Sequence, residues 1–431
     1  MMKKDILENR GIYDAMELGL PKMILLGIQH TFAMFGATVL VPLLTGLDVG
    51  TTLLMAGLGT LLFHFLTRGR IPAFLGSSFA FLGGYQMVAP MLDGRPNTEM
   101  LPYACGGVVC AGLLYLVMAA LMKFFGSEKV MRFFPPVVTG PIIISIGLIL
   151  APSAISNCAT NWPLALIALA AVLVFNLWGR GIIRLVPILL AILVSYAAAV
   201  LMHAVDFTAV REARLIGIAI HPASFAKFDL SAVITIMPIA LATMMEHIGD
   251  ICAISATTGV NYVENPGFHR TMLGDGLATS LSAMFGGPAN TTYGENTGVL
   301  ALTGVYDPRV VRFAAYFAIL LSFCPKFAAI IQTVPSAIIG GISFVLYGMI
   351  SAVGLRNLVE SKVDFSRSRN LLIAAVILVS AFGFNSIDGI SFTLAGTPVK
   401  LSGLAIAAIA GIALNAVLPL RDTAGEHETG N

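Results

Sequence analysis

The fold is decided by two short stretches, PAFLGSSF at residues 72–79 and GGPANTTYG at residues 286–294, each inside a longer apolar run. Glycine and proline remove support for a helix, and the serine, threonine and asparagine side chains offer hydrogen bonds that compete with helical backbone. Both stretches are therefore predicted to begin extended and to become helical only partway across a membrane. Non-helical backbone survives at that depth only where protein or a water-filled cavity satisfies it, which is why such breaks are typical of binding sites.

The alternative is that these glycines and prolines only kink two helices so that the helices pack closely. If the segments are broken, the half-helices that start near Phe79 and Gly294 direct free N–H groups and positive dipole ends at one point. Carbonyl oxygens of a bound solute would suit that point. We count the neighbouring Ser78 and Tyr293 among the expected substrate contacts.

The composition is that of a membrane protein. Hydrophobic residues make up 57% of the 431 residues and charged residues only 11%, and the mean hydropathy is +0.88, far from the balance expected of soluble domains. A net charge of +2 without a basic stripe gives nucleic acid nothing to bind. The five cysteines have no metal-ligand spacing, so neither a metal nor another cofactor is expected.

Apolar runs predict an all-α polytopic protein with fourteen spans. The first seven lie within 22–204, near 22–46, 50–67, 73–91, 102–123, 136–155, 163–179 and 182–204. The second seven lie within 231–419, near 231–255, 270–286, 290–303, 309–323, 326–351, 369–385 and 400–419. A segment at 1–21 precedes them, a link at 205–230 separates them and a tail at 420–431 follows.

Charge and local similarity set the orientation and the relation between the two halves. With both termini in the cytoplasm, most of the 25 Lys and Arg residues fall on the cytoplasmic side and the link at 205–230 lies outside. GSSFAF at 76–81 is similar to NTTYGE at 290–295, QH at 29–30 is similar to EH at 246–247, and the stretch that starts at Pro135 is similar to the stretch that starts at Pro335, each about half a chain length away. Because each half has an odd number of spans, the halves are expected to be inverted repeats, with extended segments breaking spans 3 and 10.

Acidic residues inside the spans are the second clue to function. Glu246 and Asp250 are four residues apart, so they share one face of a helix, and Glu295 opens the half-helix after the second broken stretch. A carboxylate inside a membrane span costs several kcal/mol and usually lines a path for solutes or protons. The alternative for Asp250 is an ordinary charge at the membrane interface. His30 and His247 fall at matching points of the repeat, either as structural hydrogen-bonding partners or as proton carriers.

The run ENTGVLALTG at 295–304 agrees at every fixed position with E/Q-N-x-G-x-x-x-x-T-R/K/G, and on it the chain resembles the nucleobase-ascorbate transporter family. The resemblance extends to QHTFAMFGAT at 29–38, GSSFAF at 76–81 and EHIG at 246–249, and it is strongest to bacterial members that carry uracil. It implies a core domain of spans 1–4 and 8–11 that moves against a gate domain of spans 5–7 and 12–14. It also implies a homodimer in the bacterial inner membrane, in contact with lipid, and uptake of a nucleobase coupled to protons.

Carried over by position, the resemblance makes Glu246 and Glu295 the carboxylates that bind the base, opposite the Phe79 and Gly294 amides. His30, His247, Asp250 and Asn296 are then expected to support the site or the coupling to protons.

Asp250 departs from the uracil-carrying members, which have a second histidine there, and is similar to purine-transporting relatives. The expected function is therefore proton-driven import of uracil, with xanthine or another purine base as the alternative substrate and sodium as an alternative coupling ion. An anion carrier of the same architecture is a further alternative, which two buried acids disfavour. A membrane-embedded enzyme is disfavoured because neither H-E-x-x-H nor G-x-S-x-G occurs, and a channel is disfavoured because no ring of pore-lining groups is evident.

Overall fold

The computed structural model describes residues 11–92, 96–132, 134–387, 389–394 and 397–419. The predicted tail at 420–431 and the first ten residues of the predicted segment at 1–21 lie outside the described residues. The first half of the chain forms η1 (Ala15–Leu18), α2 (Leu20–Thr45), α3 (Val49–Leu66), β1 (Leu75–Ser77), η2 (Phe79–Phe81), α4 (Leu82–Val88), α5 (Leu101–Phe125), α6 (Ser127–Met131), α7 (Pro136–Ala159), α8 (Trp162–Trp178), α9 (Ile182–Leu185) and α10 (Pro187–Leu201). The link contains α11 (Thr208–Glu212) and η3 (Pro222–Ser224).

The second half is built from elements of the same kinds. It forms α12 (Leu230–Ile236), α13 (Ile239–Thr258), the π-helical turn η4 (Val263–Gly267), α14 (Phe268–Met284), β2 (Asn290–Thr292), α15 (Gly294–Thr303), α16 (Pro308–Ser322), α17 (Pro325–Gln332), α18 (Ser336–Glu360), α19 (Ser368–Ser386), β3 (Ile390–Leu394), β4 (Thr397–Leu401) and α20 (Gly403–Val417). The protein is therefore mainly helical, with two small two-stranded antiparallel sheets in the described part.

Seven of the described helical segments are long and apolar enough to cross a membrane, or eight if α16 and α17, which meet at 86°, count as one bent span. Three further apolar helices, α8, α10 and α20, are shorter. A hydrocarbon core of about 30 Å needs about 20 helical residues, so these lengths establish a multi-pass membrane protein.

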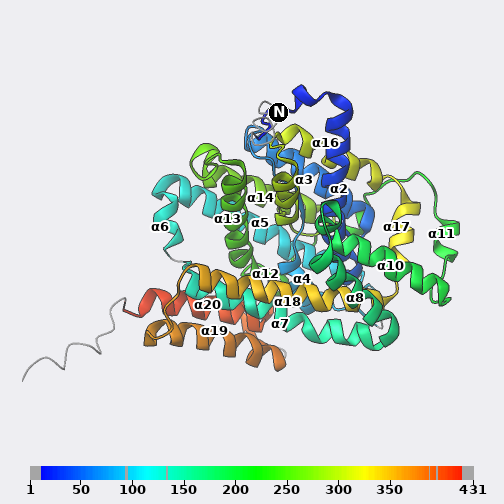
Figure 1. The fold of residues 1–431 in the computed structure, drawn as a ribbon. Helices are drawn as coiled ribbons and strands as arrows, with labels where there is room; N and C mark the ends of the chain where they lie inside the picture. The colour runs from blue at the N-terminus through cyan, green and yellow to red at the C-terminus, as the bar shows by residue number, and fades with distance from the viewer. Residues whose placement is uncertain (1–10, 93–95, 133, 388, 395–396, 420–431) are drawn as a thin grey trace, which may run out of the picture.

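The helices form two groups. In Figure 1, α7, α18, α19 and α20 lie along the bottom of the view, where α7 packs against α18 and α19 packs against α20. Helices α2, α3, α13, α14 and α16 stand above them, and α14 packs against both α3 and α5. The strands β1 and β2 belong to this second group, where β1 contacts α2 and α3 and β2 contacts α14.

The two stretches at residues 72–79 and 286–294 meet as an antiparallel pair, with Leu75 opposite Thr292 and Ser77 opposite Asn290. All six strand residues are buried, so water cannot satisfy their backbone. Neighbouring helices supply the missing bonds: the Thr60 hydroxyl of α3 bonds both N–H and C=O of Leu75, and the Thr279 hydroxyl of α14 donates to the Asn290 carbonyl. Extended backbone is thus stabilised deep in the protein.

The structure corrects the predicted span at 326–351. Pro335 lies in the middle of that stretch, lacks an N–H group and disfavours helical backbone at the residue before it. Helix α17 accordingly ends at Gln332, and α18 starts at Ser336 and continues to Glu360. The hairpin of β3 and β4 is a second difference, because that region was predicted as a loop followed by a span from residue 400.

Glycines allow the long helices to approach closely. A Cβ at Gly112 of α5 would lie 2.7 Å from the carbonyl oxygen of Gly276 in α14, and a Cβ at Gly354 of α18 would lie 2.7 Å from that of Gly140 in α7. Both distances are too short for any side chain unless the backbones move apart. Small residues at such contacts replace the hydrophobic driving force that lipid cannot provide.

The replacement Gly354→Ala is expected to lower the melting temperature of the detergent-purified protein by several degrees, because overpacking costs about 1–3 kcal/mol. Gly348→Ala on the same helix is the matched control, since nothing lies within 4 Å of a Cβ at that position. Alanine there is expected to leave stability unchanged or slightly raised. Equal melting temperatures for the two variants would contradict this account of the α7–α18 contact.

Candidate functional site

Helix α13 lies where the two half-helices begin. It contacts β2, α15 and the 3-10 helix η2, and it carries Glu246 and Asp250 one turn apart. A Cβ at Gly294 would lie 3.6 Å from Asp250 Oδ1, so this carboxylate sits beside the first residue of α15. The helix that carries the two predicted acids therefore contacts both half-helices, and Asp250 lies beside the start of α15.

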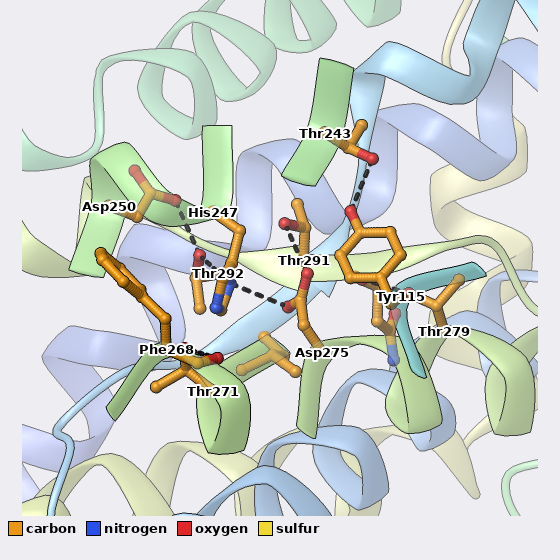
Figure 2. A network of polar contacts seen from close by, with 12 residues as sticks. Tyr115, Thr243, His247, Asp250, Phe268, Thr271, Asp275, Thr279, Thr291 and Thr292 are labelled. Carbon is orange, nitrogen blue, oxygen red and sulfur yellow. Dashed lines mark hydrogen bonds and ion pairs between the residues drawn. The ribbon is translucent and has the colours of Figure 1, made fainter. Parts of the chain in front are cut away.

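Asp250 is the end of a chain of polar contacts that runs into the protein (Figure 2). The Thr292 hydroxyl lies 2.8 Å from Asp250 Oδ2 and 3.3 Å from His247 Nδ1. A hydroxyl has one proton, so when Thr292 donates it to an ionised Asp250 the Thr292 oxygen can only accept from His247. His247 Nδ1 then carries the proton, and it also lies 3.5 Å from Asp275 Oδ1.

Asp275 of α14 is the inner end of this chain. Its side chain is fully buried, and its second oxygen accepts a hydrogen bond of 3.3 Å from Thr291 of β2. Neither Asp275 Oδ1 nor His247 Nε2 has a conventional hydrogen-bond partner among the described residues. A buried acid and imidazole with spare bonding capacity can hold or pass a proton.

Asp275 is not among the predicted site residues, although the sequence contains a signal for it. The ninth predicted span covers residues 270–286, and Asp275 is an acid in the middle of that span. The rule that made Glu246 a candidate applies equally to this residue. The threonines that connect the chain, at 291 and 292, were predicted only as breakers of a helix.

The first residues of the half-helices carry free backbone donors. Phe79 opens η2 and Gly294 opens α15, so neither amide has an acceptor within its helix. The Ser78 N–H is occupied by the Ala289 carbonyl at 2.9 Å, whereas the buried Ser78 hydroxyl has no partner among the described residues. Phe79, Gly294 and the Ser78 hydroxyl thus leave donors available at the two helix starts.

Glu295 faces a cavity of about 720 Å³. The cavity lies between α2 and α15 on one side and α8, α10 and α18 on the other, and it extends to Arg180 and Arg184 near α9. Of the ten predicted site residues, Glu295 is the one that lines it. Glu246 does not line it, although both glutamates are exposed rather than buried within the protein.

Three predicted site residues have their polar groups engaged with the protein. The Asn296 amide group donates to His30 Nδ1 at 3.0 Å and to the His30 carbonyl at 3.2 Å, which fixes the start of α15 against α2. The Tyr293 hydroxyl donates to the Ser77 carbonyl at 2.9 Å and accepts from Thr38. His30, Asn296 and Tyr293 therefore brace the half-helices, and Tyr293 is buried with no free hydroxyl hydrogen for a ligand.

Among the described residues there is no group of three or more His, Cys, Asp or Glu side chains placed to hold a metal ion. The acids of α13, α14 and α15 are instead spaced along helices and separated by hydroxyl groups. Their geometry suits hydrogen bonding and the movement of protons.

Known proteins with similar sequences are permeases. A family described as "Permease family" matches residues 21–390. The uracil permease of Bacillus caldolyticus is 41% identical, with 99% of this chain and 98% of that protein covered. The uracil permease of Escherichia coli K12 is 38% identical over 92% of this chain and 91% of the relative, and the putative pyrimidine permease RutG of the same organism is 40% identical over 91% and 88%.

Solved structures with similar folds are transporters of more distant sequence. The transmembrane domain of the cyanobacterial bicarbonate transporter BicA aligns with a TM-score of 0.59 at 16% identity, covering 93% of this chain and 99% of that domain. SLC26A9 aligns with a TM-score of 0.63 at 13% identity, covering 94% and 66%. These likenesses show the fold alone. The sequence matches show more: the chain belongs to the permease family that its sequence resembles, the nucleobase-ascorbate transporters, and is a transporter rather than an enzyme.

Proposed function

We propose that this protein imports uracil across the bacterial inner membrane by proton symport. The observation that carries the proposal is the position of α13, which contacts both half-helices joined by β1 and β2, carries Glu246 and Asp250, and puts Asp250 beside Gly294. The names of the relatives support uracil in particular. In this proposal Glu246 and Glu295 bind the base, and Phe79, Gly294 and Ser78 supply donors.

The chemistry of uracil matches these groups. Its ring offers two N–H donors and two carbonyl acceptors, so carboxylates on one side and half-helix amides on the other satisfy both kinds of group. An analogue that lacks one of these groups leaves a polar group of the site unpaired. Sites built to hydrogen-bond such a group discriminate against the analogue by factors of about 10⁴–10⁵. Asp250 keeps xanthine as the alternative substrate, because a second acid beside Gly294 adds an acceptor for a further ring N–H.

An anion carrier is the less favoured alternative, although the folds of BicA and SLC26A9 are similar. Helix N-termini suit an anion, but α13, which carries Glu246 and Asp250, contacts α15, which carries Glu295, and an ionised carboxylate repels an anion. Repulsion between a carboxylate and an anion in a medium of low dielectric constant costs several kcal/mol. A neutral base avoids this cost.

The architecture proposed for transport has fourteen spans in two inverted repeats, with both termini in the cytoplasm. The two helix groups support a core domain that contains α2–α5 and α12–α16 and a gate domain that contains α7–α10 and α18–α20. Prolines at 135 and 335 cap α7 and α18 at corresponding points of the two halves, which supports the repeat. A homodimer remains part of the proposal by family resemblance.

Alternating access is supported by an asymmetry between the two sides of the site. The cavity at Glu295 extends toward Arg180 and Arg184, which the charge pattern assigns to the cytoplasm. On the side assigned to the outside, the two helix groups are in contact. Gln86 of α4 donates to Ser153 of α7 at 3.3 Å, and Thr235 of α12 donates to the carbonyl of Lys400 in β4 at 2.8 Å. In this proposal the arrangement is an inward-facing state whose outer side is closed.

For proton coupling we propose that the chain from Asp250 through Thr292 and His247 to Asp275 exchanges a proton with the outside as the base binds. Neutralising an acid lowers the cost of moving the site through the membrane. No cofactor other than the proton is part of this mechanism.

Glu246→Gln is expected to weaken uracil binding at least tenfold, because a hydrogen bond to a charged group contributes about 1.5–3 kcal/mol. Binding is measured by the rise in melting temperature of the purified protein with uracil, xanthine and bicarbonate, since a ligand at 100 times its Kd stabilises by about 2.7 kcal/mol. Uracil is expected to stabilise the wild type most and bicarbonate not at all.

The matched control is Glu264→Gln, which removes an exposed carboxylate in the turn before α14. It is expected to leave the response to uracil unchanged. A full uracil response in Glu246→Gln, or a response to bicarbonate alone, would contradict the proposed site.

Asp275→Asn is expected to keep uracil affinity within about threefold of the wild type but to reduce accumulation driven by a pH gradient in proteoliposomes at least tenfold. Asparagine has the shape of aspartate and can still accept from Thr291, but it cannot carry a proton. Asp206→Asn, at an exposed position of the link, is the control. Undiminished accumulation by Asp275→Asn would exclude this residue from the proton path.

A disulfide between Gln86→Cys and Ser153→Cys, in a chain with its five native cysteines replaced, is expected to stop uracil transport because it holds the outer side closed. A reductant is expected to restore transport, and each single cysteine variant is expected to transport normally. Transport at the full rate by the cross-linked protein would mean that α4 and α7 do not separate during the cycle.

A further inference from the structure

A second cavity, of about 440 Å³, lies where the N-termini of α7 and α19 meet the C-termini of α18 and α20. Its volume is within the range of about 300–1,000 Å³ that small-molecule sites have. The described lining contains four cationic side chains, from Arg132, Lys362, Arg367 and Arg369, and one acid, Asp364. It is separate from the site at α13, with which it shares no lining residue.

Helix dipoles do not explain the charge of this cavity. Two N-termini and two C-termini meet there, so their partial charges largely cancel and the side chains decide the local potential. The Val137 amide in the first turn of α7 adds one donor that has no acceptor within its helix.

Two of the four cations have structural partners. Arg369 donates to the Asn415 carbonyl at 2.8 Å and to the Leu418 carbonyl at 3.3 Å, so it holds the end of α20. Arg367 lies 3.4 Å from Asp364. The hydroxyl and the amide of Ser366 donate to the same carboxylate. Together with Arg367 they keep the pKa of Asp364 below its ordinary value, so this acid stays ionised and is already paired within the protein.

The other two cations, Arg132 and Lys362, make no ion pair or side-chain hydrogen bond with any described residue. They come from different parts of the chain, one before α7 and one after α18, and both side chains are exposed at the cavity. Lys362 also has a positive φ of 50°, which a lysine rarely adopts. Lys and Arg residues that only set the membrane topology do not need to line a common cavity.

We propose that this cavity binds a phosphate group through Arg132 and Lys362, with Arg367 and Arg369 completing the positive surround. The phosphate is tetrahedral and anionic, and it accepts several charge-assisted hydrogen bonds at once, as unpaired ammonium and guanidinium groups require. The cavity lies at the ends of membrane-spanning helices, the level at which lipid headgroups lie. Its ligand is the headgroup of an anionic phospholipid or a soluble phosphate ester from the adjoining aqueous phase.

Native mass spectrometry of the detergent-purified protein tests this proposal with three probes: dioleoyl phosphatidylglycerol, dioleoyl phosphatidylcholine and glycerol 1-phosphate. The wild type is expected to bind the first phosphatidylglycerol molecule with a Kd about tenfold lower than that for phosphatidylcholine. In the double variant Arg132→Gln/Lys362→Gln the difference is expected to fall to twofold or less. Arg369 is left unchanged because it anchors α20.

The matched control is the double variant Lys129→Gln/Arg356→Gln, which removes two exposed cations of α6 and α18 that do not line the cavity. It is expected to keep the wild-type preference. Equal melting temperatures and elution volumes establish that all variants are folded.

The experiment distinguishes the two possible sources of the phosphate, a phospholipid headgroup and a soluble phosphate ester. Binding of glycerol 1-phosphate that disappears in the cavity variant indicates a soluble ester, and binding of phosphatidylglycerol alone indicates a lipid headgroup. The proposal is overturned if the wild type neither prefers phosphatidylglycerol to phosphatidylcholine nor binds glycerol 1-phosphate, or if the cavity variant binds these probes as the wild type does.

Discussion

Six buried residues in extended conformation, those of β1 and β2, set the constraint on which the rest of the protein depends. In a membrane protein an unpaired backbone group costs several kcal/mol, and strands usually avoid this cost by closing into barrels. Here two strands pair only with each other, so each has an outer edge that something else must satisfy. Thr60 bonds one edge through Leu75, and Thr279 bonds the other through Asn290. Polar residues inside otherwise apolar helices are thus explained by the strands beside them.

The same constraint produces the site. A helix that starts only after a strand has its first turn inside the protein rather than at the membrane surface, so its free amides point into the interior. Two such starts, at Phe79 and Gly294, lie at the two ends of one strand pair. Helix α13 fills the space beside them, and its acidic face supplies the acceptors that amides cannot provide. The fold therefore places hydrogen-bond donors from the backbone and hydrogen-bond acceptors from carboxylates in the same region.

The sequence predicts the local consequences of this design better than the long-range ones. Glycine, proline and hydroxyl residues at 72–79 and 286–294 predict extended backbone because their effects are local, and spacing predicts that Glu246 and Asp250 share a face. The partner of each strand is not predictable in this way, since pairing is set by packing across more than 200 residues. Tyr293 shows the same limit, because its hydrogen bond to the Ser77 carbonyl depends on tertiary structure that its position in the sequence does not reveal.

Two other differences between prediction and structure have a local signal in the sequence, but hydrophobicity alone does not reveal them. Pro335 predicts the break between α17 and α18, but the apolar residues on both sides of it made one long span more probable. Asp275 is flanked by Gly274 and Gly276, and these small residues let α14 pack against Phe63 of α3 and Gly112 of α5. The acid is buried because its neighbours have no side chains to hold the helices apart, a cause that only the packed structure reveals.

The strand pair also determines which part of the protein can move in the proposed cycle. Because β1 and β2 are hydrogen-bonded to each other and to α3 and α14, any displacement of one half-helix start relative to the other would break several buried bonds. The polar contacts described between the two helix groups are fewer and sit at their edges, as at Gln86 with Ser153. In the proposed cycle, a motion that keeps the strand pair intact would therefore occur at the boundary between the two helix groups.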